Sequence, residues 1–146
     1  MTTYVVRPTG PLVGVLQMPG DKSISHRAVI LGSLAAGKTT IRGLLEANDV
    51  LSTISAFQAM GVSIHRHLGE NYQIVGVGLR GLRAPRSDLD LGNSGTSMRL
   101  LCGLLTGQAF RSRLTGDQSL LARPMGRLTA PLKKMGALVR ASTGDV

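Results

Sequence analysis

The chain has 146 residues, of which 42% are hydrophobic and 3% aromatic, and this is enough for one ordinary core built mainly from aliphatic side chains. The formal net charge of +9 favours an anionic partner, such as a small phosphorylated molecule, a nucleic acid or an acidic protein surface. The single cysteine, Cys102, excludes an internal disulfide, and no apolar run approaches the length of about 20 residues that a membrane-spanning helix needs.

Short strands are predicted over residues 4–7 and 12–18, on either side of a Pro-Gly turn. Residues 23–36 are predicted to form a helix that ends with Gly37 as its C′ residue. Its expected inner face consists of apolar side chains that recur at three- and four-residue spacing: Ile24, Ala28, Leu31, Leu34 and Ala35. A strand is predicted to follow over residues 39–44.

A second helix is predicted over residues 48–60, capped by Asn48 or Asp49. The side chains expected on its inner face are Val50, Ile54, Phe57 and Leu51. Residues 62–67 and 72–77 are predicted to form a hairpin across residues 68–71.

The same order of elements recurs in the second half of the chain. The predicted elements are a strand over 89–91, a helix over 94–105 that ends near Gly107, a strand over 108–115, a helix over 119–135 and a strand over 137–141. The last helix is expected to start near Pro124 and to kink at Pro131. Matching landmarks lie about 70 residues apart: Arg27 with Arg99, Gly37 with Gly107, and Met60-Gly61 with Met135-Gly136.

These landmarks predict a duplicated β-α-β-α-β-β unit. The second copy stops at residues 142–146, where its last hairpin strand is expected. A chain that stops inside a hairpin leaves a sheet edge unpaired and part of a core exposed. The chain is therefore predicted to be a fragment, or one half of a split protein.

Two segments place small hydroxyl residues and an arginine at a predicted helix start: residues 21–27 (DKSISHR) and 92–99 (GNSGTSMR). Helix N-termini attract anions through free N–H groups and the positive end of the dipole. Lys22, Ser23 and Arg27 lie within about one turn and could together hold a phosphate or carboxylate. The alternative is an N-cap serine with two solvated cations.

The second segment offers a related set of groups. Gly95 would let a ligand approach the backbone closely, and Arg123, just before Pro124, is expected near a helix start. A solvated arginine at the rim is the alternative for Arg123. His26, in the first segment, is either an acid–base group or a solvated or packed histidine.

Residues 32–39 (GSLAAGKT) match the P-loop pattern letter for letter. A P-loop follows a strand and opens a helix, whereas this segment is predicted to end a helix and to precede a strand. Its N–H groups would then not converge on a phosphate. Nucleotide binding is therefore disfavoured.

Three motifs resemble those of the 5-enolpyruvylshikimate-3-phosphate synthase family, the enolpyruvyl transferases of the shikimate pathway. They are residues 19–27 (PGDKSISHR), residues 92–96 (GNSGT), and Gly116-Asp117 followed by residues 123–126 (RPMG). The likeness covers essentially the whole chain, as about the N-terminal third of such an enzyme.

The resemblance implies an α/β (α+β) fold of repeated β-α-β-α-β-β units, an inside-out α/β barrel that is incomplete here. The family has two globules of three units each. Residues 1–20 are then expected to be a strand segment of the other, C-terminal globule. Residues 21–146 are expected to form nearly two of the three units of the N-terminal globule.

The resemblance also implies a transferase, 3-phosphoshikimate 1-carboxyvinyltransferase, of aromatic amino-acid biosynthesis. This enzyme moves the enolpyruvyl group of phosphoenolpyruvate to the 5-hydroxyl of shikimate 3-phosphate and releases phosphate. The implied contacts of shikimate 3-phosphate are Lys22, Ser23 and Arg27, and those of phosphoenolpyruvate are Lys22, Gly95, Arg123 and Asn93. Lys22 is also implied to be catalytic, and neither a metal nor an organic cofactor is implied.

The family's principal acid and base residues are implied to lie in a C-terminal part, so this chain alone is expected to be inactive. Its expected partners are the two substrates and that complementary part, with no nucleic acid and no membrane. The absence of a signal-peptide pattern predicts a cytoplasmic location. Gly95 leaves room for glyphosate, the family's inhibitor at the phosphoenolpyruvate site, but Leu100 and Ser94 suggest a divergent bacterial subtype.

Two other functions remain as alternatives. A UDP-N-acetylglucosamine enolpyruvyl transferase shares the repeat architecture, but is not expected to carry the Lys-Ser-x-Ser-x-Arg segment of residues 22–27. A nucleic-acid-binding module would use the basic stretch from Arg99 to Arg140. The low aromatic content argues against single-strand binding, which usually needs stacking platforms.

Overall fold

The structure is a computed structural model that describes residues 3–67 and 71–141. The first half forms α1 (Lys22–Leu34), β1 (Ala36–Arg42), α2 (Asn48–Ala59), β2 (Ser63–His67) and β3 (Asn71–Val77). The second half forms β4 (Leu89–Asp90), α3 (Gly95–Thr106), β5 (Leu114–Thr115), α4 (Gln118–Leu121) and α5 (Gly126–Lys134). Over the described residues, no helix combines the length and the apolar character that crossing a bilayer requires.

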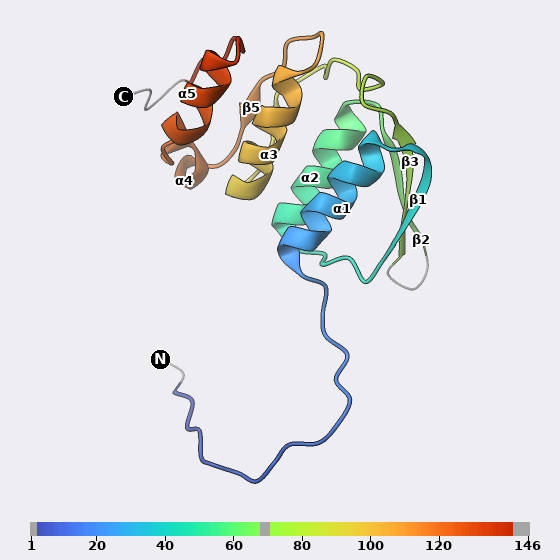
Figure 1. The fold of residues 1–146 in the computed structure, drawn as a ribbon, viewed down its shortest axis with the longest axis vertical. Helices are drawn as coiled ribbons and strands as arrows, with labels where there is room; N and C mark the ends of the chain where they lie inside the picture. The colour runs from blue at the N-terminus through green and yellow to red at the C-terminus, as the bar shows by residue number, and fades with distance from the viewer. Residues whose placement is uncertain (1–2, 68–70, 142–146) are drawn as a thin grey trace.

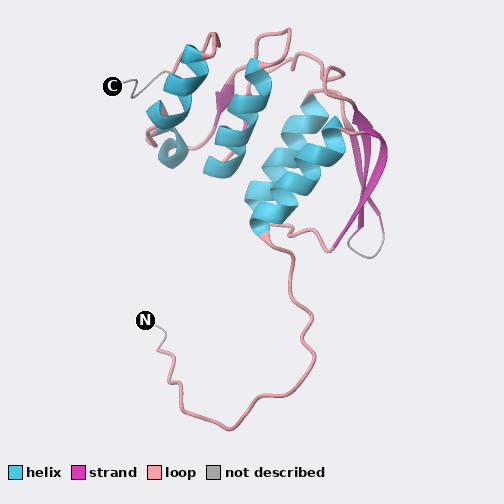
Figure 2. Ribbon diagram, viewed as in Figure 1, coloured by secondary structure: helices cyan, strands magenta, loops and turns pink. Residues whose placement is uncertain are grey.

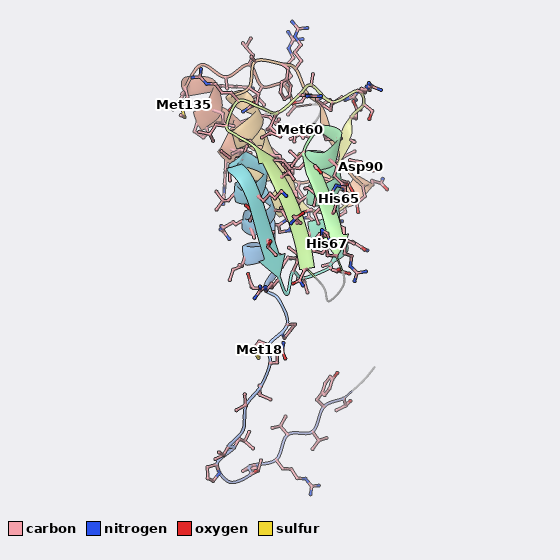
Figure 3. The ribbon with its side chains drawn as sticks, turned by 90° about the vertical axis from the view of Figure 1, so that its right-hand side faces the viewer. Met18, Met60, His65, His67, Asp90 and Met135 are labelled. Atoms are coloured by element: carbon pink, nitrogen blue, oxygen red, sulfur yellow. The ribbon has the colours of Figure 1, made fainter. Side chains whose placement is uncertain are left out.

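The first half is an antiparallel sheet in the order β1-β3-β2, with α1 and α2 covering one face (Figures 1 and 2). Alternate side chains of the strands point toward the helices, as the two-residue period of a strand requires. Tyr72 and Ile74 of β3 are buried on this inner face, next to Ile64 of β2. Figure 3 looks at the opposite face, where the labelled His65 and His67 are exposed.

Helix α1 lies unusually close to the central strand because glycines face each other at the contact. A Cβ atom built on Gly76 of β3 would collide with the carbonyl oxygens of Gly32 and Ala35 at the end of α1. A Cβ on Gly32 would lie 3.2 Å from the Ile74 side chain. Close backbone approach of this kind is a position that only glycine fills.

The second half packs α3 against the two-stranded parallel sheet of β4 and β5. Its buried hydrophobic side chains include Leu89, Leu91, Leu101, Leu105 and Leu120. They belong to the same core cluster as Val29, Phe57 and Met60 of the first half. The two halves therefore share one continuous hydrophobic core.

Four helices point in the same direction, which positions the candidate site. In Figure 1 the N-terminal ends of α1, α2, α3 and α5 all lie at the lower edge of the globule. Each helix carries its positive dipole end and its unpaired N–H groups at that edge. The lower edge is therefore electropositive before any side-chain charge is counted.

Several predicted elements are confirmed. The two long helices of the first half, the β2–β3 hairpin and α3 lie within two residues of their predicted positions. The hairpin strands pair antiparallel from Ser63 opposite Val75 to His67 opposite Asn71. Val50, Ile54 and Phe57 are buried in α2 as predicted.

The predicted inner face of α1 is only partly correct. Ala28 and Leu34 pack against the core, but Ile24 and Leu31 are 67% and 66% exposed. The buried residues of the helix are Ser25, His26, Val29, Gly32 and Ser33. Gly32 lies at the contact with β3, because a Cβ atom there would already lie 3.2 Å from the Ile74 side chain.

The predicted ends of two helices also need correction. Gly37 is not the C′ residue of α1, because the helix ends at Leu34 and Gly37 lies inside β1, with a φ of 99°. Neither Asn48 nor Asp49 caps α2, because both lie within the helix and its N-cap is Ala47, which has no side-chain cap. Leu51 is 36% exposed, so it does not belong to the inner face of α2.

The strands predicted over residues 4–7 and 12–18 are absent. Residues 3–19 run away from the globule as an extended segment without regular structure (Figure 1). A strand needs a neighbour for its N–H and C=O groups, and this segment has none among the described residues. The assignment of residues 1–20 to another globule stays a prediction.

Three elements of the second half also differ from prediction. Only Leu114–Thr115 of the strand predicted over 108–115 forms, and no strand forms over 137–141. The helix predicted over 119–135 is two helices, α4 and α5, with Pro124 between them and Pro131 inside α5. The predicted break at residues 142–146 lies outside the described residues.

A candidate anion site at the helix N-termini

The first group of predicted site residues lies at the start of α1. The carboxylate of Asp21 caps the helix by accepting a hydrogen bond of 2.7 Å from the N–H of Ile24. This cap makes Lys22 and Ser23 the first two helical residues, and both are exposed. One turn later, Nη1 of Arg27 lies 3.3 Å from the carbonyl oxygen of Ser23 and donates to it. The three residues therefore share one exposed helix end.

Lys22 is tied to the neighbouring helix. Its Nζ atom lies 2.9 Å from Oδ2 of Asp49, in the first turn of α2. The two side chains are 51% and 27% exposed, so the pair is accessible to solvent and to a ligand. An exposed pair of this kind contributes little stability, typically about 0–1 kcal/mol. Its structural effect is to orient the ammonium group toward the junction of α1 and α2.

The second group lies at the start of α3. Ser94 is the N-cap, and its Oγ accepts a hydrogen bond of 3.2 Å from the N–H of Ser97. Asn93 bridges two charged residues: its Nδ2 donates to Oδ2 of Asp117 at 2.7 Å, and its Oδ1 accepts from Arg123. The pKa of Asp117 is lowered, chiefly by the Asn93 hydrogen bond and then by the N–H of Leu120. These contacts hold the Arg123 guanidinium beside the α3 N-terminus.

Gly95 leaves room for two arginines at this end. A Cβ atom on Gly95 would lie 2.8 Å from Nη1 of Arg123 and 2.8 Å from Nη1 of Arg99. Arg99 also donates a hydrogen bond of 3.1 Å to the carbonyl oxygen of Gly95. Two guanidinium groups therefore converge on the first residue of α3. This is an arrangement that suits a carboxylate or phosphate.

The two groups are linked beneath the surface by hydroxyl groups. His26 Nδ1 of α1 lies 2.9 Å from Thr53 Oγ1 of α2, and Thr53 Oγ1 lies 2.6 Å from Ser97 Oγ of α3. Thr53 and Ser97 were not among the predicted site residues. The available signal was a hydroxyl residue in the first two turns of each of these two helices.

His26 is fully buried, which confirms the packed alternative among those considered from the sequence. Burial lowers the pKa of His26 below its ordinary value of 6.5; Asp49 opposes this effect, and the cations Lys22 and Arg27 add to it. The unfolded chain therefore binds a proton at this position more readily than the folded chain does. The contribution of neutral His26 to stability is fully present above pH 6.5 and is lost as the pH falls below it.

The free energy of unfolding of this chain is thus expected to decrease between pH 7 and pH 5, by up to about 1.4 kcal/mol per unit of pKa difference. Urea unfolding of the His26→Gln variant at both pH values should lack this part of the decrease. His65→Gln, at an exposed position of β2, is the matched control and should follow the wild-type pH dependence. Parallel pH profiles for wild type and His26→Gln would contradict the prediction.

The P-loop-like segment is not part of this site. Residues 32–39 end α1 and form the first half of β1, so they do not open a helix. Lys38 is exposed on β1, opposite Val75 of β3. The structural context that nucleotide binding requires is therefore absent, as the sequence analysis predicted.

Comparison with known proteins connects this geometry to one family. The model of the EPSP synthase family (3-phosphoshikimate 1-carboxyvinyltransferase) matches residues 6–146. A 3-phosphoshikimate 1-carboxyvinyltransferase of Ruthia magnifica is 57% identical over 100% of this chain and 33% of its own length. One of Acidithiobacillus ferrooxidans is 58% identical over 99% of this chain and 33% of its own length.

A solved structure agrees with these matches. The EPSP synthase from Acinetobacter baumannii has a TM-score of 0.85 and 51% identity, and the match covers 90% of this chain and 30% of that one. The mixed helices and strands of this chain are therefore part of the α/β enolpyruvyl transferase fold. The chain spans about a third of the length of the curated relatives it matches. With a family model matching nearly its whole length, the chain belongs to the EPSP synthase family.

Proposed function

We propose that this chain supplies part of the substrate site of an enolpyruvyl transferase. In the proposed reaction, the enolpyruvyl group of phosphoenolpyruvate moves to the 5-hydroxyl of shikimate 3-phosphate, and phosphate is released. One observation carries the proposal. Two helix N-termini, each with cationic side chains and small residues, are held side by side by a buried hydrogen-bonded link between α1, α2 and α3. The predicted cytoplasmic location belongs to the same proposal.

The α1 end suits the 3-phosphate of shikimate 3-phosphate. Lys22 offers an ammonium, Ser23 a hydroxyl and Arg27 a guanidinium, all on one exposed end beside the helix dipole. A phosphate dianion can accept hydrogen bonds from all three groups. Hydrogen bonds to charged groups contribute about 1.5–3 kcal/mol each, so this set can hold a small phosphorylated molecule.

The α3 end suits phosphoenolpyruvate. Arg123 is oriented by Asn93, and the absence of a side chain on Gly95 exposes the helix start to a second anion. Lys22, on the neighbouring helix, is proposed to contact both substrates. The pairing of two anion-binding sites matches a reaction whose two substrates are both polyanions.

The proposed chemistry requires orientation and charge stabilisation from these residues. The 5-hydroxyl adds to the central carbon of phosphoenolpyruvate while the methylene carbon gains a proton, and the tetrahedral intermediate then expels phosphate. Lys22 and Arg123 would offset negative charge and hold the reacting carbon near the hydroxyl. The groups that move the protons are proposed to come from the complementary part of the enzyme, which is the proposed partner of this chain.

A chimaera tests the proposed function. It consists of this chain in place of the matching third of the Ruthia magnifica relative, and is called the chimaera below. Incubated with phosphoenolpyruvate, it is expected to form an enolpyruvyl product with shikimate 3-phosphate and none with UDP-N-acetylglucosamine, as followed by ¹H NMR of the product methylene. The unmodified relative is the control. If the folded chimaera forms a product only with UDP-N-acetylglucosamine, the alternative function, a UDP-N-acetylglucosamine enolpyruvyl transferase, replaces the proposed one.

The Gly95→Ala variant of the chimaera is expected to raise the KM for phosphoenolpyruvate at least tenfold. The new Cβ would lie 2.8 Å from Nη1 of both Arg99 and Arg123, so the two guanidinium groups must move away from the α3 N-terminus. Because these are the ends of flexible side chains, the melting temperature should change little. The KM for shikimate 3-phosphate should stay within about twofold of the wild-type value.

Gly103→Ala is the matched control for this substitution, because it adds the same methyl group to α3 where nothing lies within 4 Å. It should leave both KM values unchanged. Equal increases in the two KM values of Gly95→Ala would show that the start of α3 does not select phosphoenolpyruvate. Such a result would contradict the placement of that substrate.

A further inference from the structure

We propose that a buried chain of hydrogen bonds from Ser94 through Ser97 and Thr53 to His26 is a positioning device for the two anion sites. It holds the N-termini of α1, α2 and α3 at a fixed relative position, so that the two bound substrates meet in a reactive geometry. The inference rests on the proposed function and goes beyond it, because none of these four residues is proposed to touch a substrate.

The chain of hydrogen bonds is continuous across the three helices. Ser94 Oγ lies 2.6 Å from Ser97 Oγ, and Ser97 Oγ lies 2.6 Å from Thr53 Oγ1. Thr53 Oγ1 lies 2.9 Å from His26 Nδ1. His26, Thr53, Ser94 and Ser97 are each 0% exposed. Hydrogen bonds in such a dry environment are strong and sensitive to distance.

One arrangement of protons connects all four residues. The carbonyl oxygen of Asp49 can only accept; Thr53 Oγ1 lies 3.2 Å from it and Ser97 Oγ 3.5 Å, and in this arrangement the nearer Thr53 hydroxyl donates to it. Thr53 then accepts from the Ser97 hydroxyl and from an N–H at His26 Nδ1. In the same arrangement, Ser94 donates to Ser97. The Thr53 hydroxyl thereby bonds to Asp49 in the first turn of α2, and Asp49 is the residue that forms the ion pair with Lys22.

The second nitrogen of His26 supports this arrangement. Nε2 is buried and has no hydrogen-bond partner among the described residues. A proton placed there would be a buried donor without an acceptor, which costs more than a bare lone pair. The neutral Nδ1–H tautomer avoids that cost and supplies the donor that Thr53 requires.

The hydrogen-bonded residues adjoin the proposed contact residues at three points. Ser94 precedes Gly95, His26 precedes Arg27, and Asp49 pairs with Lys22. Apolar side chains at the same junction would pack across a range of helix positions, whereas a connected set of hydroxyl groups fixes the distances between helices. The polar composition of this junction is therefore explained by positioning.

The Thr53→Val variant tests the proposal, because it removes the central hydroxyl and keeps the shape of the side chain. In the chimaera, it is expected to lower kcat at least tenfold and to change the KM of each substrate less than twofold. Thr53→Ser, which restores the hydroxyl, should recover most of kcat. Ser33→Ala is the matched control: it removes a buried hydroxyl of α1 that donates only within the helix, to Val29 at 2.7 Å, and should leave kcat unchanged.

A second measurement does not depend on the reaction. In the ¹⁵N-labelled 146-residue chain, the His26 ring should show the Nδ1–H tautomer, and Thr53→Val should shift the amide signals of both Ser23 and Gly95. If the wild-type chimaera is inactive with every acceptor, the proposed function fails. This measurement still decides whether the buried hydrogen bonds connect the N-termini of α1 and α3. Shifts confined to α2, or a Thr53→Val enzyme with unchanged kcat, would overturn the inference. An equal loss of kcat in Ser33→Ala would also overturn it.

Discussion

Replacing Lys22 with methionine in the chimaera is expected to lower kcat/KM for phosphoenolpyruvate by roughly 100-fold or more. Lys22 is the first residue of α1 and is oriented by Asp49 toward the junction with α2, where both substrates are proposed to approach. Methionine is an unbranched side chain only one heavy atom shorter than lysine and carries no charge, so the loss measures the ammonium group. The ion pair is exposed, so the melting temperature should stay within a few degrees of the wild-type value.

Lys38→Met is the matched control for this prediction. Lys38 lies exposed on β1 in the P-loop-like segment, and the same substitution there should leave turnover unchanged. Near-normal turnover of Lys22→Met, measured by steady-state phosphate release, would remove Lys22 from the site. A comparable loss in Lys38→Met would instead point to a general effect of positive charge or to the nucleotide-binding alternative.

Gly76→Ala is expected to lower the free energy of unfolding of this chain by about 3 kcal/mol. The added Cβ would collide with two backbone carbonyl oxygens, those of Gly32 and Ala35, at the contact of α1 with β3. A side chain can avoid such a collision by changing its rotamer, but these backbone carbonyl groups cannot. Helix α1 must therefore move away from the sheet. That movement would open the core around Ile74 and Val29, which are both fully buried.

Gly103→Ala again provides the comparison, because its Cβ meets nothing within 4 Å on α3. It is expected to be neutral or to stabilise the chain by up to about 1 kcal/mol, since alanine favours a helix more than glycine does. Urea unfolding followed by far-UV circular dichroism gives both values. A Gly76→Ala variant as stable as wild type would show that the close packing of α1 on β3 is not required.

Sequence periodicity located most of the regular structure because local signals determine it. The small hydroxyl residues around Ser94 predicted the start of a helix, and residues 72–77 were predicted as a strand, without knowledge of any neighbour. The inner face of α1 could be found only in part in this way. The apolar stripe of Ile24 and Leu31 has the right spacing for burial, but burial depends on which neighbour a helix meets.

The missing strands show the same limit. Residues 12–18 and 137–141 have strand-like composition, but a strand forms only where another strand accepts its hydrogen bonds. Within the described part of the chain, neither segment has such a neighbour. Pairing is a long-range property, so composition alone overestimated the number of strands.

The candidate site was predictable in its residue types and less so in its connections. Lys22, Ser23 and Arg27 share a helix end as the spacing predicted, and Asn93, Gly95 and Arg123 come together at the start of α3. The positions of Thr53 and Ser97 were not predictable, because each is an ordinary polar residue until the three helices are packed. Their roles as substrate contacts or positioning groups are proposals that the variants above test.

Phosphate release from phosphoenolpyruvate and shikimate 3-phosphate tests the proposed function most sharply. It is measured with this chain alone, with the separately expressed remaining two-thirds of the Ruthia magnifica relative, and with the two mixed. Phosphate release is expected only in the mixture, and it should be lost when the chain carries Lys22→Met. Release by the chain alone would contradict the proposal that the proton-moving groups lie elsewhere. If the two parts bind each other but the mixture releases no phosphate, the result would contradict the assigned reaction.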